Sequence, residues 1–329
     1  MPHSPDPSPA PRQSAWLIAG CLLSVYVIWG TTYFAIKVGV QGSPPFFLIG
    51  TRFLVAGAVL TLWQLLYRRR APSVRQWRNA ALLGFLLLVV GNGGVAVAER
   101  WVSSGATVAL ISVMPIATAL WSGAFGHWPR RLEWVAIAIG AVGAGVMLMG
   151  RDLQGSLTGT LMILCGTTCW SLGTVLSRRL DLPHGPLGFG AEMLSAGVIA
   201  LFVSAVLGEH WALPHAPEVW WAWAYLVVFG SLIGFSAYRY VVERVSPTLA
   251  ATYAYVNPPV ALLVGWWLGH ESFSANVLLG LPIVLLVVGL LAWIQTRSSP
   301  SPSPSPSPSP SPRGAASAAP VPAPANAVR

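Results

Sequence analysis

The chain alternates between long apolar runs and short polar breaks, and this pattern predicts ten membrane-length segments. Each run holds about 20 residues, enough to cross a hydrocarbon core of ~30 Å at ~1.5 Å per residue. The segments are expected near residues 15–36, 45–66, 79–98, 104–125, 132–149, 156–176, 186–207, 219–238, 248–268 and 275–295. Residues 1–14 and 296–329 form polar, Pro-rich tails, and the run of Ser-Pro pairs in the second tail favours a disordered extension.

Composition supports this interpretation. Of the 329 residues, 54% are hydrophobic and only 9% are charged, whereas soluble domains carry roughly 25% charged residues. In lipid, helices satisfy their own backbone groups, so we predict an all-α polytopic membrane protein. The net charge of +9 resides in segment ends and short loops, where it indicates topology. We therefore expect a lipid bilayer around the chain and no nucleic acid as a partner.

The basic residues predict that both termini lie in the cytoplasm. With that orientation, 15 of the 19 Lys and Arg residues fall on the inside, and Lys37, Arg100 and Arg151 fall on the outside. The remaining basic residue, Arg52, lies within a segment. Cytoplasmic loops carry the excess of Lys and Arg in membrane proteins, and an even number of crossings returns the chain to the same side.

An internal repeat organises the chain. Residues 93–115 and 235–258 have the same plan, with an apolar segment ending in Glu-Arg, a polar break and a second apolar segment that contains Pro. The two stretches are about 143 positions apart, which indicates a duplication of the kind that must be recognised before other features are interpreted. We predict two halves, 15–150 and 156–295, each with five crossings. An odd number of crossings inverts one half relative to the other, the architecture associated with alternating access.

Several motifs recur in order over both halves. They are Trp29-Gly30-Thr31-Thr32-Tyr33, Arg52-Phe53-Leu54, Glu99-Arg100, Met114-Pro115 and, in the second half, Asn257-Pro258-Pro259. This order resembles the EamA family of the drug/metabolite transporter superfamily over about 280 residues. The resemblance implies a ten-helix secondary transporter that exports small metabolites, amino acids or drugs across the bacterial cytoplasmic (inner) membrane. One departure is Gly126-His127, because the family often carries Gly-Glu at the end of the fourth helix.

Two charged residues lie inside apolar segments at equivalent places in the two halves. Arg52 is expected about 10 Å from the outer surface, where an arginine is costly unless it faces a cavity, water or a partner. It is a candidate substrate or gating residue, and the alternative is a structural arginine that pairs with carbonyl groups. Glu192 is a candidate proton-coupling group, and the alternative is a carboxylate that reaches interfacial water.

Polar and aromatic residues in the middle of the segments are candidates for lining a central substrate path. Asn and Tyr at membrane depth need partners, which a wet cavity supplies, although helix packing explains each of them equally well. The candidates are Trp29, Tyr33, Asn92, Met114, Trp121, Trp170, Tyr238, Tyr253, Tyr255 and Asn257. An aromatic wall with few charges suits a weakly polar or zwitterionic small-molecule substrate.

Other chemistry is not indicated by the sequence. No phosphate-binding loop of the Gly-x-x-x-x-Gly-Lys-Ser/Thr type is present, and we expect no cofactor. The loop Gly208–Glu218 contains two His and two Glu residues, but this spacing alone is a weak metal signal, and we expect no metal. The alternatives to an exporter are an uncoupled permease, an integral-membrane enzyme and a receptor. The substrate, the coupling ion and the oligomeric state stay open.

Overall fold

The computed structural model describes residues 11–68, 71–102, 104–149, 157–183, 185–211 and 214–269, with scattered helical positions between 275 and 293. The tail at 296–329 and residues 1–10 lie outside this description. Throughout the described residues the chain is helical, without strands. The first half contains α1 (Pro11–Gly42), α2 (Pro45–Arg68), α3 (Val74–Leu83), η1 (Gly84–Asn92), α4 (Gly93–Ala98), α5 (Ser104–Ile111), α6 (Met114–Ala124) and α7 (Arg131–Leu148). The second contains α8 (Leu157–Leu176), α9 (Pro186–Val206), α10 (Pro217–Tyr225), η3 (Leu226–Ile233), α11 (Gly234–Val242), α12 (Pro247–Ala250) and α13 (Tyr253–Gly269).

Six continuous stretches of the described chain are long and apolar enough to cross a membrane. They are Ala15–Gly42, Pro45–Tyr67, Val74–Ala98, Leu157–Leu176, Pro186–Val206 and Pro217–Val242. They correspond to the first three expected segments of each half. The fourth and ninth expected segments are each divided into two helices, α5–α6 and α12–α13. The expected tenth segment is described only at scattered positions, so the described chain contains six of the ten expected segments as continuous apolar stretches of membrane length.

The third and eighth expected segments each contain a π-helical stretch in the middle. These stretches are η1, between α3 and α4, and η3, between α10 and α11. The wider π turn is rare and is frequently found at functional sites. Both stretches lie beside the central cavity described below, η1 through Gly91 and Asn92 and η3 through Gly230 and Ser231. The sequence pattern predicted neither of them.

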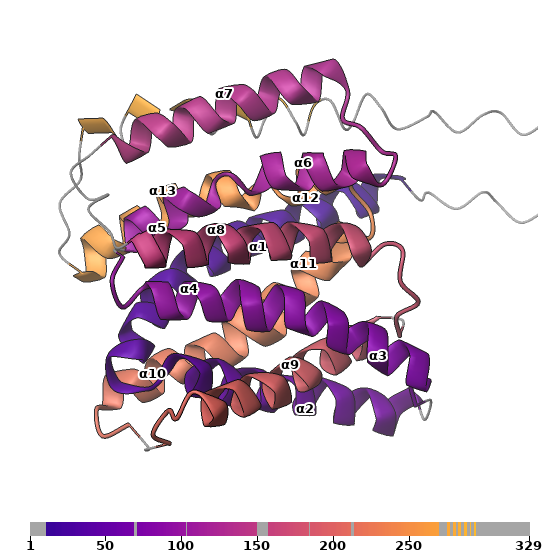
Figure 1. The fold of residues 1–329 in the computed structure, drawn as a ribbon. Helices are drawn as coiled ribbons and strands as arrows, with labels where there is room; N and C mark the ends of the chain where they lie inside the picture. Colours follow the sequence, from indigo (N-terminus) through magenta and orange to yellow (C-terminus); the bar gives the residue numbers. More distant parts are fainter. Residues whose placement is uncertain are drawn as a thin grey trace, which may run out of the picture.

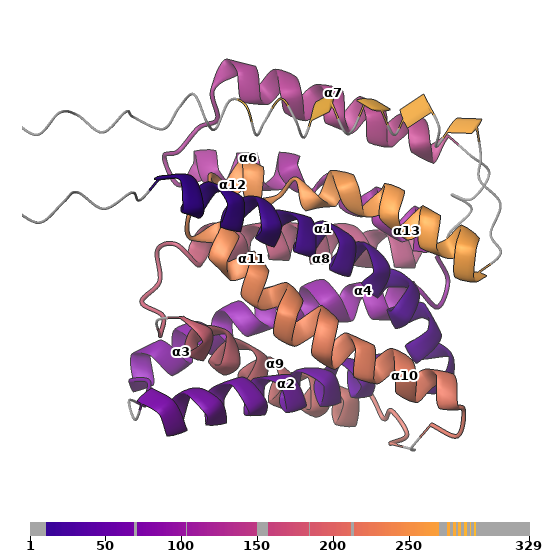
Figure 2. The ribbon, with the colours of Figure 1, turned by 180° about the vertical axis from the view of Figure 1, so that it is seen from behind.

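The helices are arranged in layers between α2 and α9 at one side and α7 at the other, with α1 and α8 in between (Figure 1 and Figure 2). The two halves are interleaved. Helix α1 packs on α10, α11 and α13 of the second half, whereas α8 packs on η1, α4 and α6 of the first half. This reciprocal exchange is what a two-fold relation between the halves produces.

Among the described helices, the most extensive pairing is between α2 and α9, the second helix of each half. A Cβ atom on Gly57 would lie 2.4 Å from the backbone nitrogen of Leu194, and one on Gly197 would lie 2.5 Å from that of Leu54. These contacts are reciprocal, because residues 54 and 57 correspond to 194 and 197 in the repeat. Glycine lets the two backbones approach closely where lipid supplies little driving force for association.

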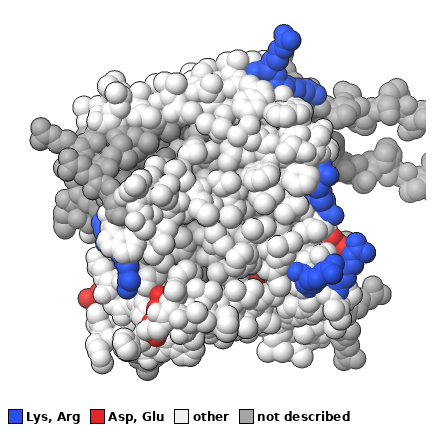
Figure 3. Space-filling view, in the orientation of Figure 1, with Lys and Arg blue, Asp and Glu red and all other residues white. Residues whose placement is uncertain are grey.

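Charged side chains gather at the two ends of the helix bundle, and most basic ones lie at the end where α1, α3 and α7 begin (Figure 3). We call this the basic end. Its arginines include Arg75 and Arg78 at the start of α3, Arg131 at the start of α7, and Arg178 and Arg179 after α8. The uncharged surface between the two ends is the part of the bundle suited to lipid.

Candidate functional site

A cavity lies in the middle of the bundle, where both halves contribute side chains. Its volume is about 50 Å³, which accommodates a few water molecules but is too small for a metabolite. Seven of the residues expected along a substrate path line it, namely Trp29, Tyr33, Arg52, Asn92, Met114, Trp170 and Tyr253. The structure therefore brings together residues that are up to 224 positions apart in the sequence.

Arg52 is the charged residue of this cavity. Its side chain is 1% exposed, and its Nε donates a hydrogen bond of 2.8 Å to the hydroxyl of Ser231 in η3. Its Nη1 has no hydrogen-bond partner among the described residues. A Cβ atom at Gly230 would approach Nη2 to 2.9 Å, so glycine at this position leaves space for the guanidinium. A buried cation with an unused donor is costly inside a membrane, and an anionic group entering the cavity would relieve that cost.

An aromatic cluster forms another part of the cavity wall. Trp29 and Trp170 occupy equivalent positions in the two halves, and their rings meet edge to face with centroids 5.5 Å apart. Trp29 also contacts the rings of Phe235, Tyr238 and Tyr253 at 4.8–5.0 Å. Its indole nitrogen donates to the carbonyl oxygen of Gly230 at 3.2 Å. The cluster therefore offers apolar surface beside the fixed charge of Arg52.

Five expected path residues do not line the cavity. Tyr238 lies behind Trp29 and bonds to the hydroxyl of Thr174 at 2.7 Å. When the amide of Asn257 is oriented so that its nitrogen faces the neighbouring acceptors, it donates to the carbonyl oxygens of Tyr26 and Tyr253. Trp121 is half-buried in α6, away from the cavity lining, and Glu192 belongs to a separate polar network. Tyr255, another candidate, is buried and donates to the carbonyl oxygen of Ile137 at 3.2 Å.

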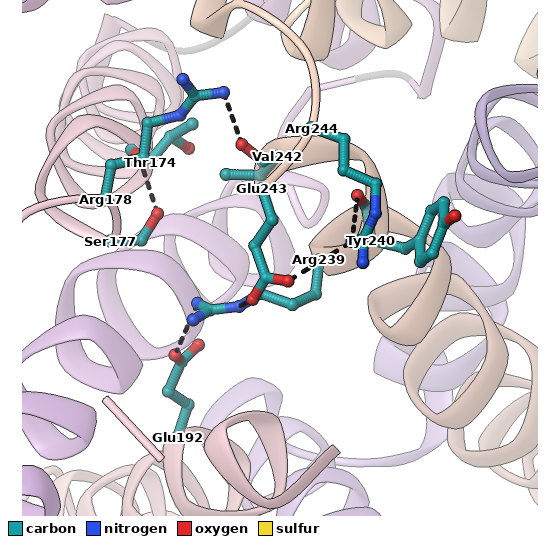
Figure 4. A network of polar contacts seen from close by, with 9 residues as sticks. All are labelled: Thr174, Ser177, Arg178, Glu192, Arg239, Tyr240, Val242, Glu243 and Arg244. Atoms are coloured by element: carbon teal, nitrogen blue, oxygen red, sulfur yellow. Dashed lines mark hydrogen bonds and ion pairs between the residues drawn. The ribbon is translucent and has the colours of Figure 1, made fainter. Parts of the chain in front are cut away.

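Glu192 lies in a network of charges that joins α9 to the end of α11 (Figure 4). Its carboxylate is 3.6 Å from Nη1 of Arg239, and the two side chains are 2% and 13% exposed. Arg239 also pairs with Glu243, four residues further on, and Glu243 in turn contacts Arg244. Glu192 is thus a buried, paired carboxylate, and it does not reach Arg52. The sequence placed Arg239 in a loop and so missed this pair.

Glu209, in the loop Gly208–Glu218, caps the N-terminus of α2. Its carboxylate accepts hydrogen bonds from the backbone nitrogens of Phe46 and Phe47 and from the hydroxyl of Ser204. An acidic group at a helix N-terminus is stabilising because it binds free N–H groups and faces the positive end of the dipole. Among the described residues, no group of three His, Cys, Asp or Glu side chains has the arrangement of a metal site.

Several cavity residues have no distinctive sequence signal. Ser231 holds Arg52, while Thr32, Thr167 and Phe235 line the cavity together with the glycines Gly91 and Gly166. Ser, Thr and Gly are common throughout membrane helices, where they support close packing. For Gly91 and Ser231, which lie in η1 and η3, counting at 3.6 residues per turn would also assign the wrong helix face.

Comparison with known proteins settles the family. A model of the EamA-like transporter family matches residues 16–149 and again residues 157–293. The chain belongs to this family. The first match covers the first half of the chain and the second match covers the second half, so the chain has the two-repeat architecture of the EamA family. The family consists of transporters, which places the chain among them rather than among the membrane enzymes that the sequence left open.

Individual relatives agree with this assignment. The chain is 42% identical over 270 residues to the uncharacterized inner membrane transporter YedA of Escherichia coli K12, covering 82% of this chain and 88% of that one. It is 25% identical to the uncharacterized transporter YoaV of Bacillus subtilis, over 79% and 91% of the two chains. A solved crystal structure has the same fold, with a TM-score of 0.68 at 19% identity over 87% of this chain and 99% of that one. The EamA member described here is therefore a membrane transport protein.

Proposed function

We propose that this EamA protein is a secondary transporter of the inner membrane that exports small metabolites, amino acids or drugs carrying an anionic or zwitterionic group. The observation that carries the proposal is Arg52, which is buried in the central cavity with Nη1 unpartnered in the described structure. A guanidinium binds carboxylate and phosphate groups through paired, charge-assisted hydrogen bonds. The aromatic wall of Trp29, Trp170 and Tyr253 suits the less polar remainder of the same substrate.

The size of the cavity implies that substrate binding requires helices to move. A volume of about 50 Å³ is well below the roughly 300 Å³ or more of a typical small-molecule site. Alternating access provides such movement, because two inverted halves can rock around a fixed central site. The breaks between α5 and α6 and between α12 and α13 divide equivalent segments beside the cavity, so these helices are suited to move.

Two glutamates at equivalent positions of the two halves differ in burial and in pairing, and this difference supports alternating access. Glu99 and Glu243 occupy matching places in the repeat. Glu99 is 6% exposed, and neither carboxylate oxygen has a hydrogen-bond partner in the described chain. Glu243 is 41% exposed and pairs with Arg239 and Arg244. An inverted-repeat transporter exchanges the environments of equivalent residues when the site opens to the other side of the membrane. We therefore interpret the asymmetric conformation as one of the two end states of that cycle.

The proposal also includes the orientation of the protein in the membrane and the residue that couples transport to protons. We place the basic end in the cytoplasm, with both termini, because basic residues predominate on that side. Glu192 is the proposed coupling group, because a buried carboxylate paired with one arginine can take up a proton when that arginine moves away and release it when the pair forms again. A permease without ion coupling would use the same cavity and would not depend on Glu192.

The experiment is counterflow of labelled compounds in proteoliposomes. Amino acids and aromatic carboxylates would be compared with their amides or esters, which lack the negative charge. We expect transport of charged members only, loss of transport in Arg52→Ala and partial transport in Arg52→Lys. Arg75→Ala, which removes an exposed arginine at the basic end, is the matched control and should transport normally. Full transport by Arg52→Ala, at equal amounts of inserted protein, would eliminate the charge-based site.

A further inference from the structure

A second and larger cavity lies at the basic end, between α6, α8 and the start of α7. Its volume is about 490 Å³, within the range of sites that bind small molecules. The residues that matter for its chemistry are Ser122, His127, Trp128, Arg178, Arg179 and Ser246. None of them was singled out as a site residue from the sequence.

The two arginines of this cavity are held mainly by backbone carbonyl groups. Arg178 donates to the carbonyl oxygens of Val242 and Val245, at the end of α11. Arg179 donates to the carbonyl oxygen of Phe125, and its guanidinium lies 3.1 Å from Nδ1 of His127. In the described part of the chain, neither arginine has a carboxylate within ion-pair distance. Their positive charges are therefore positioned but not neutralised, which favours an anion.

The carboxylate in the cavity wall offsets only part of this charge, because the two arginines outnumber the one glutamate. Glu133 accepts a hydrogen bond of 2.9 Å from the backbone nitrogen of Arg130, and so caps the start of α7. Ser122, by contrast, is 7% exposed, and its hydroxyl has no partner among the described residues. The cavity wall thus combines two arginines with a buried hydroxyl that has no partner in the described chain.

The cavity also adjoins the central site along α6 and α8. Met114 and Thr167 line the central cavity, while Ser122 and Val175 line the second one. On each helix the two positions are eight residues apart, or about 12 Å. Between them lie buried hydroxyls, including Thr118, which has no partner among the described residues, and Ser171, which donates to the carbonyl oxygen of Met114. Leaving a buried hydroxyl unpaired is costly, so this seam is suited to receive polar atoms when α6 and α8 separate.

We propose that this cavity is a vestibule that binds the anionic oxygens of a carboxylate or phosphate, and from which a substrate passes between α6 and α8 to Arg52. The inference rests on the proposed function for its second step, the passage to Arg52. The first step, anion binding at Arg179 and Ser122, stands on the geometry of the vestibule alone. An anionic lipid headgroup presents the same oxygens, so the test must separate the two sources.

The test measures the reactivity of a thiol placed in the vestibule. Ser122→Cys is introduced into a protein whose native cysteines, Cys21, Cys165 and Cys169, are replaced. Its rates with an anionic (sulfonatoethyl) and a cationic (trimethylammonioethyl) methanethiosulfonate are each divided by the rate with a free thiol. In phosphatidylcholine liposomes we expect the anionic reagent to be favoured about tenfold or more. Arg179→Gln should bring the normalised ratio close to one, and Arg179→Lys should retain the preference.

Inorganic phosphate is the competing probe. It should slow the reaction of the thiol with the anionic reagent when Arg179 is present, and it should have no effect in Arg179→Gln. Adding phosphatidylglycerol should leave the protection by phosphate unchanged. If phosphatidylglycerol alone protects the thiol, the cavity binds lipid headgroups and the vestibule is refuted. Equal normalised rates, or no reaction at Ser122→Cys and at the second position Val175→Cys, would also refute it. Arg52→Ala should leave these rates unchanged, so a failure of the central site is distinguished from a failure of the vestibule.

Discussion

The contact between α2 and α9 gives the sharpest test of the two-fold architecture. In Gly57→Ala the new Cβ would lie 2.4 Å from the backbone nitrogen of Leu194, and in Gly197→Ala it would lie 2.5 Å from that of Leu54. An ordinary contact begins near 3.4 Å, so each variant must move the two backbones apart by about 1 Å. No side-chain rotation can relieve this clash, because the opposing atoms are backbone.

The expected magnitude follows from two opposing terms. Overpacking a well-filled contact costs about 1–3 kcal/mol, while alanine gains up to about 1 kcal/mol over glycine in helix propensity. We therefore expect each variant to lose about 1–2 kcal/mol. Because the two substitutions force the same separation, the double variant should lose less than the two single losses combined.

Gly20→Ala is the matched control. It makes the same substitution in α1, but a Cβ atom there has no heavy atom within 4 Å. Only the propensity term remains, so its stability should be unchanged or slightly higher. The assay is thermal unfolding of purified protein in detergent, in which Gly57→Ala and Gly197→Ala should lower Tm by about 2–5 °C. If they unfold at the temperature of Gly20→Ala, the close approach of α2 and α9 is not present in the protein.

Two further predictions concern the charges. Because removing one partner of a buried ion pair leaves the other uncompensated, Arg239→Gln should destabilise the protein by about 3–5 kcal/mol. Adding Glu192→Gln should restore part of that loss, and strictly additive effects of the two substitutions on thermal unfolding would show that the pair at 3.6 Å is not coupled. For the topology, a cysteine at Ser299 should be protected from an impermeant thiol reagent in intact cells, whereas one at Ala212 should react. Reaction at Ser299 would reverse the orientation proposed from the basic residues.

The sequence by itself determined the class of protein, the repeat and the family. Apolar runs of membrane length are unmistakable because lipid excludes charge from about 20 consecutive residues. The duplication is visible because Glu99-Arg100 and Glu243-Arg244 recur with their surroundings, and the match of the family model to both halves confirms the membership. The isolated charge of Arg52 was also evident, since one arginine inside an apolar run needs no three-dimensional information to be noticed.

Only the tertiary structure decided which residues meet. The interleaving of α1 and α8 with the opposite halves brings Trp29 to Trp170, and the packing of α2 on η3 places Ser231 against Arg52. Periodicity could not foresee this, because it assigns a face to a residue but not a partner. In the π-helical stretches η1 and η3 each turn contains more residues than in an α-helix. Counting at 3.6 residues per turn therefore assigns residues to the wrong helix face there. The vestibule depends most on the fold, because its two arginines are held by groups that lie 52 or more positions away in the chain.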